Sequence, residues 1–355
     1  GALSVKPGRS LMLKLPFNLP ELALLADRPR LGGLHIVEAE QVTLPPITFP
    51  PHLTALTLYY LRSAALLDAV ASSDLPVLTE LNLDQLADGV SLSGLGALSA
   101  LRSLTVQSAP GVRLTVLPPE LNSLRLERIA LAPGALADAG GLAELSAVDC
   151  VVNGLLDLPQ PGALRRIKLE GMALTALPAG LLAQPDLTHL SLRRNELSAL
   201  PESIWTMTGL EELRLSGNHL IRLPATIGQL AALRRLDLSS NQLTALPDAL
   251  GELVGLQELL LRDNPLTALP DAVGGMRSLK KLWLGQTGLT ALPRCLFDLP
   301  GLEELELRGL RIRQLPPPSA FPALRRVRID RAQEGAAHQW SRQRIQAGAP
   351  PLLVQ

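Results

Sequence analysis

Leucines recur along the chain at a fixed interval. Seven segments open 23 residues apart and an eighth follows after 22, starting at Leu164, Leu187, Leu210, Leu233, Leu256, Leu279, Leu302 and Leu324. They share the pattern LxxLxLxxNxLxxLPxxLxxLxx, as in LRRLDLSSNQLTALPDALGELVG from residue 233. A period of this length is the signature of a solenoid, in which each unit buries its apolar face by stacking on its neighbours.

The Leu-x-Leu at the centre of each unit predicts a short strand, because alternate strand residues point to opposite faces. In the unit at Leu256, we expect Leu259 and Leu261 to face the core and Leu260 to point outward. A Leu-Pro step follows, and proline fixes φ and stops the strand. The stretch after it is therefore expected to form a 3-10 or brief helical turn. The prolines concerned are Pro178, Pro201, Pro224, Pro247, Pro270, Pro293 and Pro316.

One polar position recurs in four successive units, where it holds Asn195, Asn218, Asn241 and Asn264. A buried Asn here can bond backbone groups of its own turn and of the adjacent turn, where the chain bends away from the strand. Losing such a bond should cost about 1–3 kcal/mol. We therefore predict that these residues form a structural ladder.

The N-terminal half continues the array less regularly. Earlier openings lie at Leu31, Leu53, Leu78, Leu101, Leu121 and Leu142, which gives about fourteen units in all. The Asn position is lost in this half, where it holds Leu61, Leu86, Ala109, Ile129, Cys150 and Met172. We therefore expect a less regular backbone bend there.

Three segments follow from this pattern. Residues 1–30 are expected to be an N-terminal cap or a degenerate repeat, and residues 31–330 form the repeats, which are regular from 164. Residues 331–355 are expected to form a C-terminal cap and tail, with a short helix in AQEGAAHQWSRQRIQA. An apolar solenoid needs its exposed ends covered.

Composition narrows the classes of function. The chain has 33 basic and 33 acidic residues, so its formal net charge is zero, whereas nucleic acid or an anionic membrane favours a basic excess. No uncharged apolar run approaches the ~20 residues that span a bilayer. We therefore expect neither a nucleic-acid nor a membrane partner, and we expect a monomer. The Gly-Ala start without a Met or a signal-like segment favours an excised fragment.

Motifs for catalysis or for metal binding are missing from the sequence. There is no His-Glu-x-x-His, no Walker loop and no paired-Cys motif. Cys150 occupies an inward position and is expected to be an inert buried thiol, while Cys295 has no pattern of His or acid to activate it. We therefore expect no catalytic residue, no metal and no cofactor within this chain.

Strand residues that point outward form columns across the sheet. The first column is Arg166, His189, Glu212, Arg235, Glu258, Lys281, Glu304 and Arg326. From Glu212 its signs alternate, and adjacent strands lie about 4.8 Å apart, so cross-strand ion pairs are expected. A solubilising charge ladder is favoured over recognition here, because exposed pairs contribute only about 0–1 kcal/mol each.

The second outward column is Lys168, Ser191, Arg214, Asp237, Leu260, Trp283, Glu306 and Arg328, and the third adds Arg193, Arg262 and Arg308. Leu260 and Trp283 are neighbours in the second column. An outward Leu-Trp pair in a charged sheet indicates an interface, because exposed apolar patches and Trp anchors mark binding surfaces. The predicted partner-binding residues are Leu260, Trp283, Arg262, Arg308, Arg214 and Arg235. Alternatively, the pair packs beneath the C-terminal segment, whose Trp340 and Ile345 need apolar neighbours.

The repeat pattern over residues 31–330 closely resembles the leucine-rich-repeat family. This resemblance implies an α/β fold: a curved horseshoe with a parallel sheet on the concave face, 3-10 or helical turns on the convex face, and a protein partner. The 23-residue Leu-Pro type is similar to repeats of intracellular small-GTPase-associated proteins and of bacterial type III effectors. Usage rich in Ala, Leu, Arg and Pro favours the effectors.

Some effectors of this kind join the array to an E3 ubiquitin ligase domain, but only about 25 residues follow the last repeat here. The resemblance therefore implies a protein-binding domain of a bacterial effector, which is secreted and binds a host protein in the host cytoplasm. The alternative is the substrate-recognition domain of a ligase whose catalytic part lies outside this chain.

Overall fold

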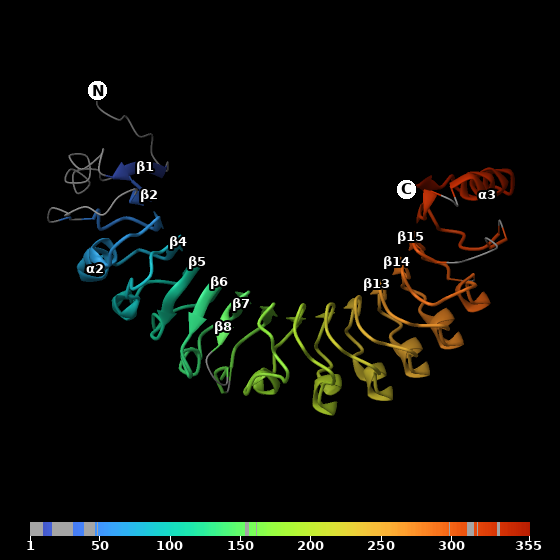
Figure 1. The fold of residues 1–355 in the computed structure, drawn as a ribbon, viewed down its shortest axis with the longest axis horizontal. Helices are drawn as coiled ribbons and strands as arrows, with labels where there is room; N and C mark the ends of the chain where they lie inside the picture. The colour runs from blue at the N-terminus through green and yellow to red at the C-terminus, as the bar shows by residue number, and fades with distance from the viewer. Residues whose placement is uncertain are drawn as a thin grey trace, which may run out of the picture. The chain divides into compact units, whose positions relative to one another are not determined.

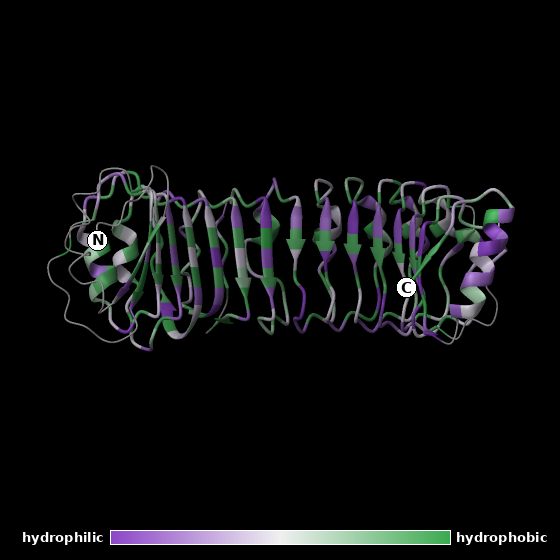
Figure 2. Cartoon of the chain, turned by 90° about the horizontal axis from the view of Figure 1, so that it is seen from above, coloured by the Kyte–Doolittle hydropathy of each residue, from purple (hydrophilic) through white to green (hydrophobic). Residues whose placement is uncertain are grey.

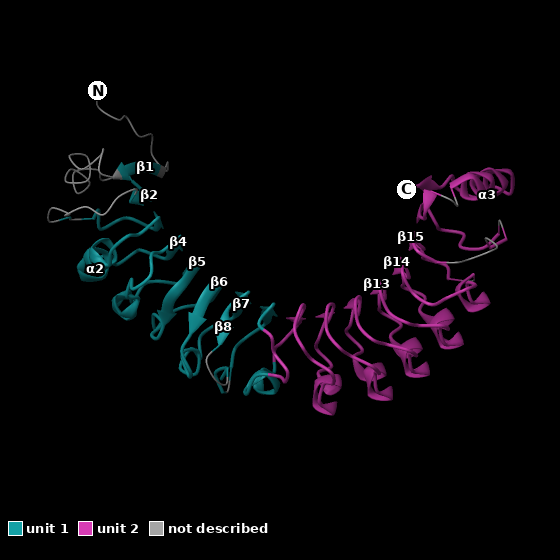
Figure 3. Ribbon diagram, in the orientation of Figure 1, with its two compact units in different colours: residues 1–172, 178–185 teal, residues 173–177, 186–355 magenta. Residues whose placement is uncertain are grey.

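The computed structural model describes residues 10–15, 31–38, 47, 49–152, 156–160, 162–297, 299–310, 316–317, 319–331 and 334–355. They form two compact units (Figure 3). Unit 1 comprises residues 1–172 and 178–185, and unit 2 comprises residues 173–177 and 186–355. Each unit contains a parallel sheet whose strands follow one another in chain order (Figure 1).

Unit 1 carries the longer strands. They are β1 (Ser10–Leu15), β2 (Gly33–Glu38), β3 (Ala55–Tyr59), β4 (Glu80–Asp84), β5 (Ser103–Leu114), β6 (Ser123–Leu131), β7 (Glu144–Val148), β8 (Val151–Val152) and β9 (Arg166–Glu170). Its helical segments are α2 (Ala65–Ser72) and the 3-10 turns η2 (Ser93–Ala97) and η3 (Leu181–Ala183). Each strand pairs in parallel with the next, except that β7 pairs with β9 and the short β8 pairs with β6.

In unit 2 each repeat strand has three residues. The strands are β10 (His189–Ser191), β11 (Glu212–Arg214), β12 (Arg235–Asp237), β13 (Glu258–Leu260), β14 (Lys281–Trp283), β15 (Glu304–Glu306) and β16 (Arg326–Arg328). Between them lie η4 (Glu202–Thr206), η5 (Ala225–Gln229), η6 (Asp248–Glu252), η7 (Asp271–Gly275) and η8 (Arg294–Leu296). The helix α3 (Glu334–Gln346) and the strand β17 (Leu353–Val354) follow. The predicted parallel sheet with short 3-10 turns is confirmed.

Equivalent residues pair across these strands, so each position of the repeat forms a column. Leu213 pairs with Leu236, and Leu236 with Leu259, and all three side chains are buried. Figure 2 shows the strands from above, with apolar and polar residues alternating along them. We call the side opposite the buried leucines the open face of the sheet. This register determines which outward side chains become neighbours.

Proline sets the start of the 3-10 turns in unit 2. Pro201, Pro224, Pro247, Pro270 and Pro293 each precede a turn, with φ between −62° and −77° and an extended ψ. That φ is the value to which the pyrrolidine ring restricts the backbone. The Leu-Pro step therefore ends the extended segment and begins the turn at the same place in these five repeats.

Successive turns pack too closely for a side chain at one position. A Cβ on Gly228 would lie 2.8 Å from the Ala249 carbonyl oxygen, and one on Gly274 would lie 2.7 Å from that of Cys295. A Cβ on Gly251 would overlap the Ala272 carbonyl. Glycine at this position therefore sets the spacing of η5, η6 and η7.

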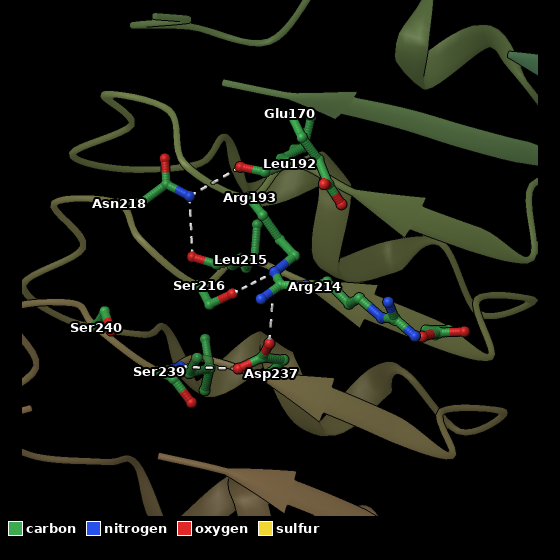
Figure 4. Close-up of polar contacts among 12 residues, drawn as sticks. Glu170, Leu192, Arg193, Arg214, Leu215, Ser216, Asn218, Asp237, Ser239 and Ser240 are labelled. Atoms are coloured by element: carbon green, nitrogen blue, oxygen red, sulfur yellow. Dashed lines mark hydrogen bonds and ion pairs between the residues drawn. The ribbon is translucent and has the colours of Figure 1, made fainter. Parts of the chain in front are cut away.

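The four recurrent Asn residues are buried and saturated with backbone hydrogen bonds. The Asn218 side-chain amide donates to the carbonyls of Leu192 and Leu215, both at 2.9 Å (Figure 4). Its oxygen accepts the Leu197 N–H at 3.1 Å. Asn241 and Asn264 repeat this arrangement one unit further on each time. Each Asn thereby ties its own turn to the preceding one.

The backbone bend is as regular in unit 1 as in unit 2, which differs from our expectation. The residue just before the Asn position has a positive φ, between 51° and 76°, in both units: Tyr60, Gln85, Ser108, Arg128, Asp149, Gly171, Arg194, Gly217, Ser240, Asp263, Gln286 and Gly309. Its N–H donates to a backbone carbonyl of the next repeat in both, from Gln85 to Gln107 (3.1 Å) and from Asp263 to Gly285 (2.9 Å). The irregularity of unit 1 lies in its strands, since β5 shifts register against β6.

Of the predicted N-terminal cap, residues 1–30, only Ser10–Leu15 lies among the described residues, and it forms β1. At the other end, α3 packs against the last repeat. Trp340 is buried edge-on against Phe321, with ring centroids 6.4 Å apart. The buried Arg344 donates to the carbonyls of Ala320, Phe321 and Leu324. No helix within the described ranges is long and apolar enough to cross a membrane.

Candidate functional site

A shallow hollow of about 480 Å³ lies on the open face of unit 2. It is lined by Arg193, Arg194, Glu212, Arg214, Ser216, Gly217, Arg235, Leu236, Asp237, Ser239, Ser240, Glu258, Leu260, Arg262, Asp263 and Trp283. The third outward column explains why it forms. Small Ser216 and Ser239 lie between the long side chains of Arg193 and Arg262, so two successive strands leave space where their neighbours do not.

The apolar wall of the hollow is the Leu260–Trp283 pair, which the register of β13 and β14 places side by side. Both side chains are half-buried. The Trp283 indole N–H donates to a Glu304 carboxylate oxygen at 3.2 Å. Cationic groups of Arg262, Lys281 and Arg328 lie 5.8, 5.6 and 5.3 Å from its ring centroid. The ring is therefore held in place by its own chain before any partner arrives.

At the other end of the hollow, Arg193 is fixed by the two strands that follow its own. Its Nε donates to Ser216 Oγ at 2.8 Å and lies 3.9 Å from an Asp237 carboxylate oxygen (Figure 4). Asp237 in turn accepts the Ser239 N–H at 3.1 Å. The guanidinium is thus positioned across three strands, above a floor of small polar residues.

The first outward column forms the cross-strand ion pairs that its alternating signs predict. Glu258 lies 3.5 Å from Arg235 and 3.4 Å from Lys281, on the strands at either side of it. Arg214, in the second column, forms its ion pair and hydrogen bond with Glu212 of its own strand. These contacts fix the basic side chains that border the hollow.

Glu306 is the residue that sequence reasoning missed. It belongs to the second outward column, yet its side chain is only 1 % exposed. One carboxylate oxygen accepts the Gly285 N–H at 2.9 Å and lies 3.6 Å from Arg262 Nε. A Cβ on Gly285 would overlap this carboxylate, so glycine in the third column leaves room for it. Gly285, between Arg262 and Arg308 in that column, was the available signal.

Burial also changes the acidity of Glu306. Loss of water around the carboxylate raises its pKa above the ordinary value, although Arg262, the Gly285 N–H and Arg308 all act in the opposite direction. Desolvation is therefore stronger than the attraction of the nearby cations. The side chain anchors Arg262 beside Trp283 at a cost in free energy whenever it is ionised.

Five of the six predicted partner-binding residues border this one hollow: Leu260, Trp283, Arg262, Arg214 and Arg235. Arg308 is not part of its lining, and its exposed side chain acts instead on the charge of Glu306. The alternative, that the C-terminal segment covers Leu260 and Trp283, is not what the structure has. Trp340 packs on Phe321, and Ile345 is exposed.

The rest of the described chain offers little reactive chemistry. No group of three or more His, Cys, Asp or Glu side chains in the described ranges could hold a metal ion. Burial raises the pKa of both the Cys150 and the Cys295 thiol, which disfavours the nucleophilic thiolate. A second hollow, of about 460 Å³, lies in unit 1 between Tyr60, Arg62 and Arg128.

Comparison with known proteins identifies the repeat. The sequence profile of the family described as leucine rich repeat matches residues 163–220, 224–266 and 255–312. No curated protein sequence matches the chain at a significant level.

Solved structures share the fold. A leucine-rich-repeat protein from Leptospira interrogans has a TM-score of 0.72 at 23 % identity, over 98 % of this chain and 99 % of that one. The leucine-rich repeats of FLRT2, in an octameric complex with Latrophilin 3 and Unc5D, have a TM-score of 0.56 at 22 % identity, over 76 % and 79 %. The plant peptide hormone receptor RGFR1, in complex with RGF2, has a TM-score of 0.50 at 18 % identity, over 92 % and 65 %.

The 23-residue period, the parallel sheet with its 3-10 turns, the matched repeats and the shared fold agree with one another. Residues 163–220 and 224–312 therefore carry leucine-rich repeats, and the chain has the fold of leucine-rich-repeat proteins.

Proposed function

We propose that this chain is a protein-binding module that holds its partner on the open face of unit 2. The observation that carries the proposal is the half-buried Leu260–Trp283 pair at the edge of a preformed hollow. Ordered aromatic anchors at the centre of a polar surface are where binding energy concentrates in interfaces. Leucine-rich repeats in solved complexes also support it, since FLRT2 assembles with Latrophilin 3 and Unc5D, and RGFR1 with RGF2.

The test compares Leu260→Ala and Trp283→Ala with the wild type. A partner is captured with the wild-type chain and purified, and its affinity for each variant is measured by titration calorimetry. Truncating a central anchor should weaken binding by about 1–3 kcal/mol per residue. The matched control is Val254→Ala, which shortens an exposed apolar side chain in the turn between η6 and β13. Variants that fold normally and bind a genuine partner at full strength would reject this surface.

A narrower proposal concerns the biological setting. The 23-residue Leu-Pro repeat and the usage rich in Ala, Leu, Arg and Pro support a bacterial effector that binds a host protein as a monomer. As the alternative, the array selects substrates for an E3 ubiquitin ligase domain elsewhere in the parent protein. Reporter fusions of the parent protein, in bacteria with and without a functional type III system, test delivery. Light scattering of the purified chain tests the monomer.

A further inference from the structure

In the ion pairs on the open face of unit 2, the acidic and basic partners differ consistently in exposure. In each of these pairs among the described residues, the carboxylate is the less exposed partner. Side chains of Glu212, Asp237, Glu258, Glu304 and Glu306 are between 1 and 24 % exposed. Their partners His189, Arg193, Arg214, Arg235, Arg262, Lys281, Arg326 and Arg328 are between 28 and 53 % exposed.

The positive and negative side chains thus differ in exposure, which the formal net charge of the chain does not show. The chain as a whole has no net charge, but five arginines line the hollow, while three of its four carboxylates, Glu212, Asp237 and Glu258, lie deeper than the cations they pair with and only Asp263 is exposed. Arginine achieves this because its long stem lies along the surface while its head stays in water. A partner approaching the hollow therefore meets a cationic layer first, with its counter-charges beneath.

The guanidinium groups have hydrogen-bonding capacity left for a ligand. Each carries five N–H donors in a planar fork, and the contacts of Arg193 with Ser216 and Asp237 are both made through Nε. Arg262 likewise faces Glu306 through its Nε at 3.6 Å. A carboxylate is the ligand that matches the remaining donors, because the two groups can bond in a bidentate fashion.

We infer that the hollow recognises an acidic stretch of polypeptide. An apolar side chain of that stretch packs on Leu260 and Trp283, and neighbouring carboxylates bind the arginines around the hollow. Glu306 makes this combination possible, since it holds Arg262 5.8 Å from the centroid of the Trp283 ring. The recognised sequence is therefore an Asp or Glu close to a Leu or an aromatic residue. This inference rests on the proposed function and specifies its ligand.

A polypeptide accounts for the surface better than a nucleic acid does. Nucleic-acid affinity comes mainly from neutralising many phosphates, which requires a basic excess. Here a carboxylate lies beneath almost every cation and weakens its attraction for a phosphate chain. The apolar wall formed by Leu260 and Trp283 also favours a ligand that carries an aliphatic or aromatic side chain beside its anionic groups.

The experiment selects binders from a random peptide library displayed on phage, with the purified chain as bait. Selected peptides are synthesised, each together with a version in which Gln and Asn replace Glu and Asp. Affinities are measured for the wild type, for Trp283→Ala and for the double variant Arg214→Gln/Arg262→Gln. Arg277→Gln, which removes an exposed arginine in the turn between η7 and β14, is the matched control.

Peptides that require Trp283 should be rich in Asp and Glu next to Leu or an aromatic residue. The double variant and the amide peptides should each bind roughly threefold to twentyfold more weakly, with Arg277→Gln unchanged. Binding should also weaken as ionic strength rises to physiological values.

Peptides that need Trp283 but are indifferent to the arginines would overturn the acidic ligand and leave the protein-binding function intact. A library that yields no peptide sensitive to Trp283→Ala would count against both. A short single-stranded RNA that displaces the peptides and binds more tightly than they do would overturn the inference in favour of a nucleic acid.

Discussion

Asn241 bonds backbone groups of its own turn and of the preceding turn. Its amide donates to the carbonyls of Leu215 and Leu238 at 3.0 and 2.9 Å, and its oxygen accepts the Leu220 N–H at 3.0 Å. An apolar replacement of similar size fills the space but leaves the Leu220 N–H without its partner, and the two carbonyls keep only their bonds to Asn218 and Asn264. At the scale of the residue, the ladder is therefore a matter of hydrogen bonds rather than of packing.

The variant Asn241→Leu tests this. We expect it to lower the free energy of unfolding by about 1–3 kcal/mol, because the Leu220 N–H loses its partner and two carbonyls each lose one of two hydrogen bonds. Urea unfolding followed by circular dichroism measures the change, and the exposed neighbour Thr244→Ala serves as control. A variant as stable as the wild type would mean that the apolar residues found at this position in unit 1 suit unit 2 equally well.

Glu306 supplies a prediction with a defined sign. Burial raises the pKa of its carboxyl in the folded state, so from about pH 4.3, the ordinary value for Glu, the unfolded chain loses this proton first. Its contribution to stability is therefore full below that pH and is lost as the pH rises through the folded-state pKa. Glu306→Gln should remove this fall, so the variant gains stability relative to the wild type between acidic and neutral pH.

Urea unfolding at a series of pH values measures it, with the exposed neighbour Glu303→Gln as the matched control. If the stability of Glu306→Gln follows the wild type in parallel across that range, burial does not control this carboxyl.

Single residues also show what the sequence pattern could predict and what it could not. The period of two along a strand correctly placed Leu260 beside Trp283, and the recurrence of Asn at one position after the strand correctly predicted that these side chains are buried. It gave the wrong depth for Glu306, because that depends on a glycine one strand away and on the reach of the carboxylate to a cation two strands away. Alternation specifies the face of a sheet, whereas the depth of a side chain on that face depends on its neighbours in three dimensions.

At the scale of the element, the 3-10 turns depend on close stacking. Gly228, Gly251 and Gly274 recur every 23 residues, and each faces the backbone of the following turn. In the next repeat this position holds Phe297, whose ring centroid lies 5.7 Å from that of Phe321. The turn η8 is correspondingly short. The Leu-Pro step predicted these turns from sequence, but the spacing between them is a tertiary property.

The matched pair Gly251→Ala and Gly255→Ala tests this stacking. A Cβ added at Gly251 would overlap the Ala272 carbonyl, whereas one added at Gly255 would have only ordinary nearest contacts, at 3.7 and 3.9 Å. We expect the first substitution to destabilise the fold by about 1–3 kcal/mol and the second to change it by less than about 0.5 kcal/mol. Thermal or urea unfolding decides, and equal effects would show that the turns are not in tight contact.

The bend that precedes the Asn position is kept where the Asn itself is missing. Loss of Asn in unit 1 led us to expect a different bend, yet the same left-handed residue recurs there, as at Gln85 and Arg128. Its N–H is satisfied by a backbone carbonyl of the next repeat, independently of the residue that fills the Asn position. A backbone conformation required by stacking is therefore kept even where its most visible sequence marker is missing.

At the scale of the whole molecule, composition conceals how charge is distributed. Thirty-three basic and 33 acidic residues cancel, and this balance argued against nucleic acid or an anionic membrane as a partner. Along unit 2 the two signs lie at different depths, so the open face presents cations around an apolar pair. Net charge is a property of the sum, whereas recognition depends on which charges reach the solvent.

The central claim is that a protein partner occupies the open face of unit 2. Site-specific photo-cross-linking tests it most directly, with a photoreactive amino acid placed either at Arg235, at the edge of the hollow, or at Val254, in the turn between η6 and β13. A captured partner that occupies this face should cross-link from position 235, and Trp283→Ala should abolish the product. Cross-linking from position 254 but not from position 235 would contradict it.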